Sequence, residues 1–263
     1  MKLRVGIVKS GEPSVDYSWT SKMDDVNFAV LRVRNLTDEF VRAVLPHKHK
    51  LLLCVVCSGY GDTVVEPNIM DIQQQAFQLK RLVSMGFPKE RVCLCVEPII
   101  PTVKGIKNFV KVVEEMHAFV SCCSVDILKN TPLIQKRFAE NKLPVLYGGE
   151  MYPSQAVWDK VDGVIAELSQ RYNLLFLCDK DNQFYCATRC EDVAMRLVCS
   201  LSPDAHYIEK VAVLNSTPYG YCKKFQLDDS FGGSCGLHKG CSTCSEHNVY
   251  GCMHSCIFCG ENA

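Results

Sequence analysis

The sequence lacks an excess of charge of either sign. Its 29 lysines and arginines are balanced by 29 aspartates and glutamates, so the formal net charge at pH 7 is zero. A neutral chain has no long-range field that would attract nucleic acid or an anionic membrane. A nucleic-acid ligand would therefore have to be held by local contacts.

Long apolar runs are also missing. No stretch approaches the ~20 apolar residues that cross a bilayer as a helix. The first residues, MKLRVGIVKSGEP, lack the apolar core and the small-residue cleavage site of a secretory signal. There is no internal repeat and no low-complexity tract. These absences lead us to expect a cytoplasmic protein.

Cysteine, by contrast, is abundant, at 17 of 263 residues. A chain of this length can build a core without disulfides, so the cysteines do not indicate a small secreted domain. Eleven precede residue 225, and most of these lie in apolar runs such as LLLCVVC (51–57), where a thiol behaves as a small apolar side chain. The other six lie at 235–259, in a stretch that is too polar to bury them as core residues.

The hydrophobic pattern predicts repeated β-α units and therefore an α/β protein with a mainly parallel sheet. An open doubly wound sheet and a partial (β/α) barrel both fit, and both place functional groups at the carboxyl ends of the strands. Strands are predicted at 3–8, 51–57, 91–96, 119–125, 144–147 and 173–178, and helices at 37–45, 70–86, 105–117, 131–141 and 156–171.

Two parts of the chain differ in composition. Residues 1–214 carry the β-α pattern and are expected to form one barrel-like domain. Residues 215–263 are polar, glycine-rich and cysteine-rich, with too few large apolar side chains for a core of their own. We expect this C-terminal extension to be a metal- or cluster-binding segment, ordered by that metal or by the main domain.

The extension ends in a three-cysteine motif, Cys252-x3-Cys256-x2-Cys259. Three thiols in so short a loop can bind three irons of a 4Fe-4S cluster and leave the fourth iron open. The pattern CxxxCxφC, with an aromatic before the third cysteine, is the signature of radical S-adenosylmethionine enzymes, and Phe258 occupies the aromatic position. In those enzymes S-adenosylmethionine binds the open iron and is cleaved to a 5′-deoxyadenosyl radical. The spacing favours such an enzyme.

Two other kinds of protein fit the same cysteines. The CxxC pairs at 241–244 and 256–259 are close to zinc-ribbon spacing, which would indicate a zinc-stabilised, non-catalytic binding protein. That alternative leaves Cys235 and Cys252 without a role and ignores Phe258. An iron-sulfur electron carrier is the third hypothesis, and it requires a fourth protein ligand to the cluster.

The motifs resemble a bacterial and phage family of radical-SAM-like domains of unknown function, itself distantly similar to spore photoproduct lyase. That family has a CxxxCxYC motif at its extreme C-terminus, a strand ending in TGYG followed by Glu-Pro, and a strand ending in WRYDP. Here the corresponding pieces are SGYG (58–61), EP (66–67) and LCVEP (94–98), and a Trp-Thr-Lys turn is matched loosely by WTSK (19–22). Their order agrees from about residue 17 to the end.

The chain also departs from that family. A family N-terminal strand with a Ser-Arg-Arg-Thr-Asp turn is missing or reduced, and Cys95 and Glu97 replace the arginine and aspartate of WRYDP. Family members carry further cysteines ahead of the final motif and on a late strand. By resemblance, an additional iron-sulfur cluster or zinc ion would be bound by Cys241, Cys244, Cys178 and Cys235.

The resemblance implies a partial (β/α) barrel of the radical-SAM type with S-adenosylmethionine bound across the strand ends. It further implies an external electron donor of the flavodoxin or ferredoxin type and a nucleotide or DNA base as the substrate. The GGE triplet at 148–150 is either a contact for the methionine amino group or a plain turn. The residues expected to bind the cofactor are Phe258, Gly59, Tyr60, Gly61, Glu66 and Glu97.

Overall fold

The computed structural model describes residues 3–8, 12–26, 28–177, 225–228 and 256–257. Its strands are β1 (Leu3–Val8), β2 (Phe28–Val33), β3 (Leu51–Val56), β4 (Val92–Ile99), β5 (Cys122–Ile127), β6 (Leu175–Leu177) and β7 (Phe225–Asp228). Its α-helices are α1 (Asp38–Val44), α2 (Ile72–Ser84), α3 (Val103–Met116), α4 (Pro132–Glu140) and α5 (Gln155–Tyr172). Short 3-10 turns are η1 (Ser18–Asp25), η2 (Leu45–His47), η3 (Lys89–Arg91), η4 (His117–Phe119) and η5 (Tyr147–Gly149).

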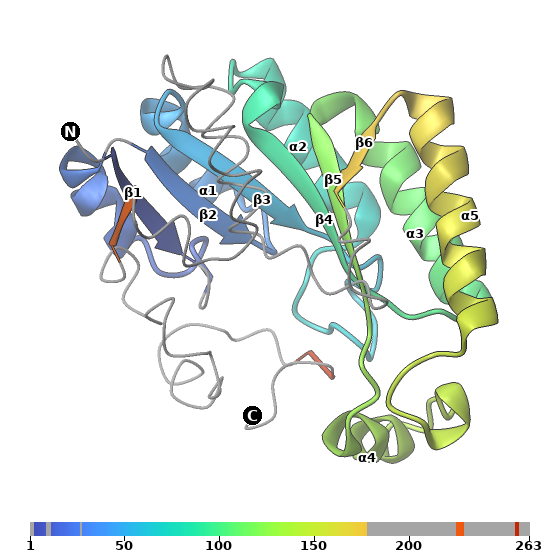
Figure 1. Cartoon of the computed structure of the whole chain (residues 1–263). Coiled ribbons are helices and arrows are strands. Elements are labelled where there is room, and N and C mark those ends of the chain that lie inside the picture. Colours follow the sequence, from blue (N-terminus) through green and yellow to red (C-terminus); the bar gives the residue numbers. More distant parts are fainter. Residues whose placement is uncertain (1–2, 9–11, 27, 178–224, 229–255, 258–263) are drawn as a thin grey trace.

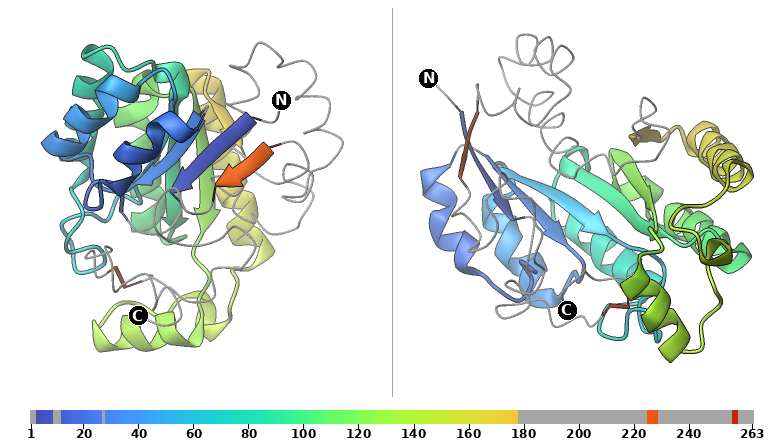
Figure 2. Two further views of the ribbon diagram at one scale, coloured as in Figure 1. Left: turned by 90° about the vertical axis from the view of Figure 1, so that its left-hand side faces the viewer. Right: turned by 60° about the horizontal axis from the view of Figure 1, so that its bottom comes forward.

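The strands form one parallel sheet in the order β6-β5-β4-β3-β2-β1-β7 (Figure 1). Because β-α-β crossovers are right-handed, strands added in one direction place their helices on the same face. Helices α1, α2, α3 and α5 accordingly form one layer, which Figure 2 shows from two further sides. The order from β1 to β6 has no reversal of the doubly wound kind. The predicted α/β class with a parallel sheet is confirmed, and the order is compatible with a partial β/α barrel.

The five predicted helices are confirmed within a few residues at each end. The strand predicted at 144–147 is wrong: this stretch leads into η5, where residues 147–149 all have positive φ, a backbone that cannot continue a strand. Strands β2 and β7 were not predicted, since Arg32 interrupts the apolar run of β2 and β7 is only four residues long. Strand β7 comes from the cysteine-rich part of the chain and pairs with β1, so this piece of 215–263 belongs to the sheet.

The main core lies between the sheet and the helix layer. Alternate residues of β3, namely Leu51, Leu53 and Val55, point into it, as a strand with a two-residue period requires. From α2, Ile72, Ala76, Leu79 and Leu82 meet them along one helix face, as their three-to-four spacing predicts. The start of α2 is fixed by a capping box between Asp71 and Gln74.

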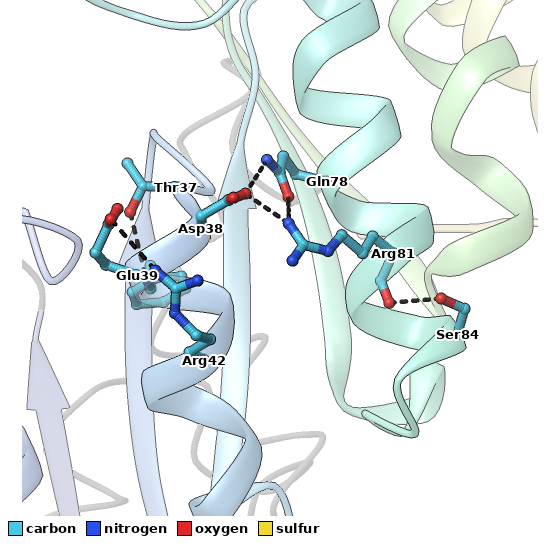
Figure 3. Close-up of polar contacts among 8 residues, drawn as sticks. Thr37, Asp38, Glu39, Arg42, Gln78, Arg81 and Ser84 are labelled. Carbon is cyan, nitrogen blue, oxygen red and sulfur yellow. Dashed lines mark hydrogen bonds and ion pairs between the residues drawn. The ribbon is translucent and has the colours of Figure 1, made fainter.

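A polar contact on the surface joins α1 to α2 (Figure 3). The carboxylate of Asp38 accepts hydrogen bonds from Gln78 at 2.7 Å and from Arg81 at 2.6 Å. The Gln78 amide and the Arg81 guanidinium lower the pKa of Asp38, because both favour its charged form. None of the helices in the described part of the chain is long and apolar enough to cross a membrane.

Gly105, in the first turn of α3, lies very close to the backbone of Ile100 and to the side chain of Tyr60. A Cβ at Gly105 would fall 1.7 Å from the Ile100 carbonyl oxygen and 2.8 Å from the Tyr60 hydroxyl. We predict that Gly105→Ala destabilises the fold by about 2 to 4 kcal/mol, because the backbone must move to make room. Gly163→Ala is the matched control: its Cβ meets nothing within 4 Å, and alanine favours the helix by up to ~1 kcal/mol. Equal urea midpoints for the two variants would contradict the packing described.

Candidate functional site

The face of the sheet opposite the helix layer carries thiols and polar side chains. Cys54, Cys93 and Cys122 lie side by side in one register row across β3, β4 and β5, and all three are buried. Their position confirms the prediction that cysteines in the apolar runs are core residues. Further along the same face, towards the carboxyl ends of β4 and β5, the side chains become polar: this end carries Ser124, Glu97 and Asp126.

A partly buried ion pair spans this polar end. Arg32 of β2 reaches across β3 to Glu97 of β4, and its Nη2 lies 2.5 Å from Glu97 Oε2. The two side chains are 17% and 8% exposed, so both charges have lost most of their water. Ser124 of β5 donates a hydrogen bond to the other carboxylate oxygen of Glu97 at 3.2 Å. The predicted site residue Glu97 is thus held in place by groups from two other strands.

Asp126 stands next to this network at the end of β5. Burial raises the pKa of Asp126 to about 7, because desolvation disfavours its charged form, and repulsion from the Glu97 carboxylate adds to the effect. Lys129 and Arg32 act in the opposite direction but do not cancel it. A carboxyl group with a pKa near neutrality, at the carboxyl end of a parallel strand, is suited to proton transfer.

Glu66 lies in the loop after β3 and is only 2% exposed. One of its carboxylate oxygens accepts a hydrogen bond from the Ser58 hydroxyl, and the Ser58 oxygen in turn accepts from the backbone N–H of Tyr60 at 3.1 Å. The other oxygen faces the thiol of Cys256, whose Sγ lies 3.7 Å from Glu66 Oε1. The structure therefore brings the middle cysteine of the C-terminal motif to a predicted site residue 190 positions earlier.

The dipeptide of Cys256 and Ile257 is fixed to the main domain by backbone contacts. Ile257 donates its N–H to the carbonyl of Val65 at 2.9 Å, and its own carbonyl accepts from Arg137 Nη1 of α4 at 3.0 Å. Figure 1 shows this short red segment near the loop that follows β3, below the strand ends. Cys256 is 5% exposed and Ile257 is 6% exposed. Both are therefore part of the folded domain.

The two glycines of the SGYG turn are packed against Met70 and Asn108, which leave no room for a Cβ atom. A Cβ at Gly61 would fall 1.9 Å from the Met70 carbonyl oxygen, and one at Gly59, which has φ of 81°, would meet the side chain of Asn108 at 2.9 Å. The same Asn108 donates to the Gly59 carbonyl at 2.9 Å. Tyr60 is buried between them, and burial raises its pKa. These contacts explain the glycines as turn residues, while a ligand-binding role for residues 59–61 stays a prediction.

Several predicted ligands lie outside the described residues. They are Cys178, Cys235, Cys241, Cys244, Cys252, Phe258 and Cys259. Among the residues that are described, no group of three or more His, Cys, Asp or Glu side chains could hold a metal ion. The one motif cysteine within them, Cys256, offers a soft sulfur donor and lies beside the carboxylate of Glu66. Sulfur is the donor type that iron-sulfur clusters use, although the thiol would first have to lose its proton next to that carboxylate.

Three residues of the site were missed by sequence reasoning: Arg32, Ser124 and Asp126. The signal was a polar residue within an apolar strand, in FAVLRV and in CCSVDI. Near the same strand ends, the GGE triplet belongs to the loop around η5, where Asn130 Nδ2 donates to the Leu146 and Glu150 carbonyls. The contacts of this loop account for a turn, and its role toward a cofactor stays a prediction.

Comparison of the chain with protein-family models finds no match, and comparison with curated proteins finds no similar sequence. The case for a function therefore depends on the motifs and on the geometry of the strand ends.

A double-mutant cycle tests the ion pair. We predict that Glu97→Gln destabilises the protein by about 3 kcal/mol, because the mostly buried Arg32 loses the negative charge with which it is paired. When Glu97→Gln is combined with Arg32→Met, urea unfolding of the single and double variants should give a coupling energy between the two residues of about 1 to 3 kcal/mol. The matched control is the pair of Glu39 and Arg42, which is 69% and 59% exposed and should couple by no more than ~0.5 kcal/mol. Equal coupling energies in the two pairs would contradict the burial of the Arg32–Glu97 ion pair.

A pH series tests Asp126. Its pKa is raised from 3.8 to about 7 on folding, so the folded state binds this proton more tightly than the unfolded state. The stabilising contribution is present below pH 3.8 and is lost as the pH rises to about 7. We predict that Asp126→Asn removes this loss and is more stable than the wild type at pH 8, by on the order of 2 kcal/mol.

Asp38→Asn is the control for that series. The pKa of Asp38 is lowered, so its contribution is present at neutral pH and is lost in acid, which is the opposite dependence. Urea unfolding of the wild type, Asp126→Asn and Asp38→Asn from pH 4 to pH 8 measures the two opposite pH dependences. A difference between Asp126→Asn and the wild type that stays constant over this range would contradict the raised pKa.

Proposed function

We propose that the chain is a radical S-adenosylmethionine enzyme in which Cys252, Cys256 and Cys259 bind a 4Fe-4S cluster. The observation that best supports this is the position of Cys256. The middle cysteine of the motif is buried at the carboxyl ends of the parallel strands, 3.7 Å from Glu66. This edge is where β/α folds carry their functional groups, and a purely local zinc ribbon would not need to contact it.

When bound, the cluster and S-adenosylmethionine would supply a 5′-deoxyadenosyl radical, with the electron coming from an external flavodoxin- or ferredoxin-type donor. The residues of the chain would bind and orient the cofactor. Glu66 and Glu97 are buried carboxylates held by Ser58, Arg32 and Ser124, and they are suited to accept hydrogen bonds from the amino group of the methionine moiety. Gly59, Tyr60, Gly61 and Phe258 complete the proposed cofactor site.

Asp126 would exchange a proton with the substrate. Its pKa of about 7 lets it either give or accept a proton at physiological pH, and its place beside Glu97 puts it near the proposed cofactor site. We keep a nucleotide or DNA base as the proposed substrate class. The carboxyl groups of Glu66, Glu97 and Asp126 can hydrogen-bond the polar edge of a base, and the phosphate of a nucleotide would have to lie away from them because like charges repel.

The remaining expectations form part of the same proposal. The sheet would be the partial (β/α) barrel of the radical-SAM type, and residues 215–263 would be its metal- or cluster-binding extension. Four further cysteines are proposed to bind a second centre, either another iron-sulfur cluster or zinc: Cys178, Cys235, Cys241 and Cys244.

Metal analysis of anaerobically purified and reconstituted protein tests the proposal. We expect four or more irons with matching sulfide. The electron paramagnetic resonance spectrum of the reduced protein should change when S-adenosylmethionine is added, because the cofactor binds the open iron. Cys252→Ala should lose this signal. Cys54→Ala is a matched control, since Cys54 is a buried thiol of the sheet outside the motif.

The competing functions give other outcomes. Stoichiometric zinc without a cluster, lost in Cys241→Ala but kept in Cys252→Ala, would establish the zinc-stabilised binding protein instead. A cluster whose spectrum ignores S-adenosylmethionine would establish an electron carrier, because all of its irons would then have protein ligands.

A further inference from the structure

Ile257 occupies a small apolar cluster of its own, separate from the main core. It shares this cluster with seven other buried side chains, which come from the loop after β3, from the ends of β4 and β5, and from α4 and the loop beyond it. We call them the Ile257 cluster: Tyr60, Val65, Ile100, Leu128, Ile134, Phe138 and Leu146. Because the side chain of Ile257 is 94% buried among them, it cannot leave without exposing apolar surface to water.

Polar contacts fix the direction of the same segment. The Val65 carbonyl accepts from the N–H of Ile257 at 2.9 Å, and the Arg137 guanidinium donates to the carbonyl of Ile257 at 3.0 Å. An apolar side chain could rotate within its pocket, but two backbone hydrogen bonds leave one orientation. The preceding residue, Cys256, is consequently turned toward Glu66.

We infer that Ile257 and Arg137 are positioning residues, which hold Cys256 in its place at the carboxyl edge of β3 before any metal is bound. Insofar as Cys256 is taken to be a cluster ligand, the inference rests on the proposed function. The contacts themselves belong to the metal-free chain. A ligand that is already in place binds without the entropy cost of ordering it, so these residues favour cluster assembly although neither can bind iron.

The first test uses the full-length, metal-free protein and the alkylating reagent N-ethylmaleimide under anaerobic conditions, with labelling of each cysteine followed by peptide mass spectrometry. We expect Cys256 to react slowly in the wild type and about 10-fold faster or more in Ile257→Ala and in Arg137→Gln, because each loses a contact that closes the segment. Ile257→Val should stay close to the wild type, and Arg137→Lys should recover part of the protection.

The controls separate this local effect from unfolding. Val145→Ala shortens a branched side chain that is 78% exposed, and Arg171→Gln removes an exposed ion pair with Glu114. Neither should change the labelling of Cys256, and Cys54 and Cys93 should stay protected in every variant. If Ile257→Ala also exposes Cys93, Arg137→Gln decides the matter. Wild-type labelling of Cys256 in Arg137→Gln would overturn the inference.

A second measurement connects the contacts to the cluster. Iron and sulfide are added to each metal-free protein, and the rate and extent of iron uptake are followed by absorbance. We expect Ile257→Ala and Arg137→Gln to load at least several-fold more slowly than Val145→Ala. A wild type that never binds iron would refute the proposed function while the labelling result stands. Equal loading of all variants would refute the positioning role while the function stands.

Discussion

Parallel pairing of β2 to β5 in chain order is the constraint on which the candidate site depends. It sends every crossover helix to one face of the sheet and brings the carboxyl ends of all four strands to one edge. Arg32, Glu97 and Ser124 can form one network only because β2, β4 and β5 lie within four successive strands that run in the same direction. A reversed strand would have placed one of these groups at the far edge of the sheet.

The polar end of the sheet is organised differently from the core behind it. Between the sheet and the helices, most of the buried side chains of the described residues are apolar and pack against one another. On the opposite face, Glu66 and Glu97 are buried but compensated, while burial leaves Asp126 with a raised pKa. A fold selected for stability alone would have little use for a carboxyl group whose charge is disfavoured in this way, which is why this end of the sheet is the functional candidate.

The contact of Cys256 with Glu66 joins two parts of the chain that differ in character. The sheet and its helices have enough apolar residues to fold around their own core, whereas the C-terminal part has few. Strand β7 and Ile257 show how two pieces of that part gain structure, one by pairing with β1 and the other by filling an apolar cluster at the strand ends. These two short pieces are thus held in place by contacts with the larger domain.

The sequence by itself determined the α/β class, the five helices and the three-cysteine motif, because hydrophobic periods and residue spacings are local properties of a chain. It also pointed to Glu66 and Glu97 through their motifs. Only the tertiary structure decided that Arg32 pairs with Glu97, that Asp126 lies beside them, and that residues 144–147 are a loop. These outcomes depend on which strands become neighbours and on what surrounds each carboxyl group, and neither can be obtained from the spacing of residues along one chain.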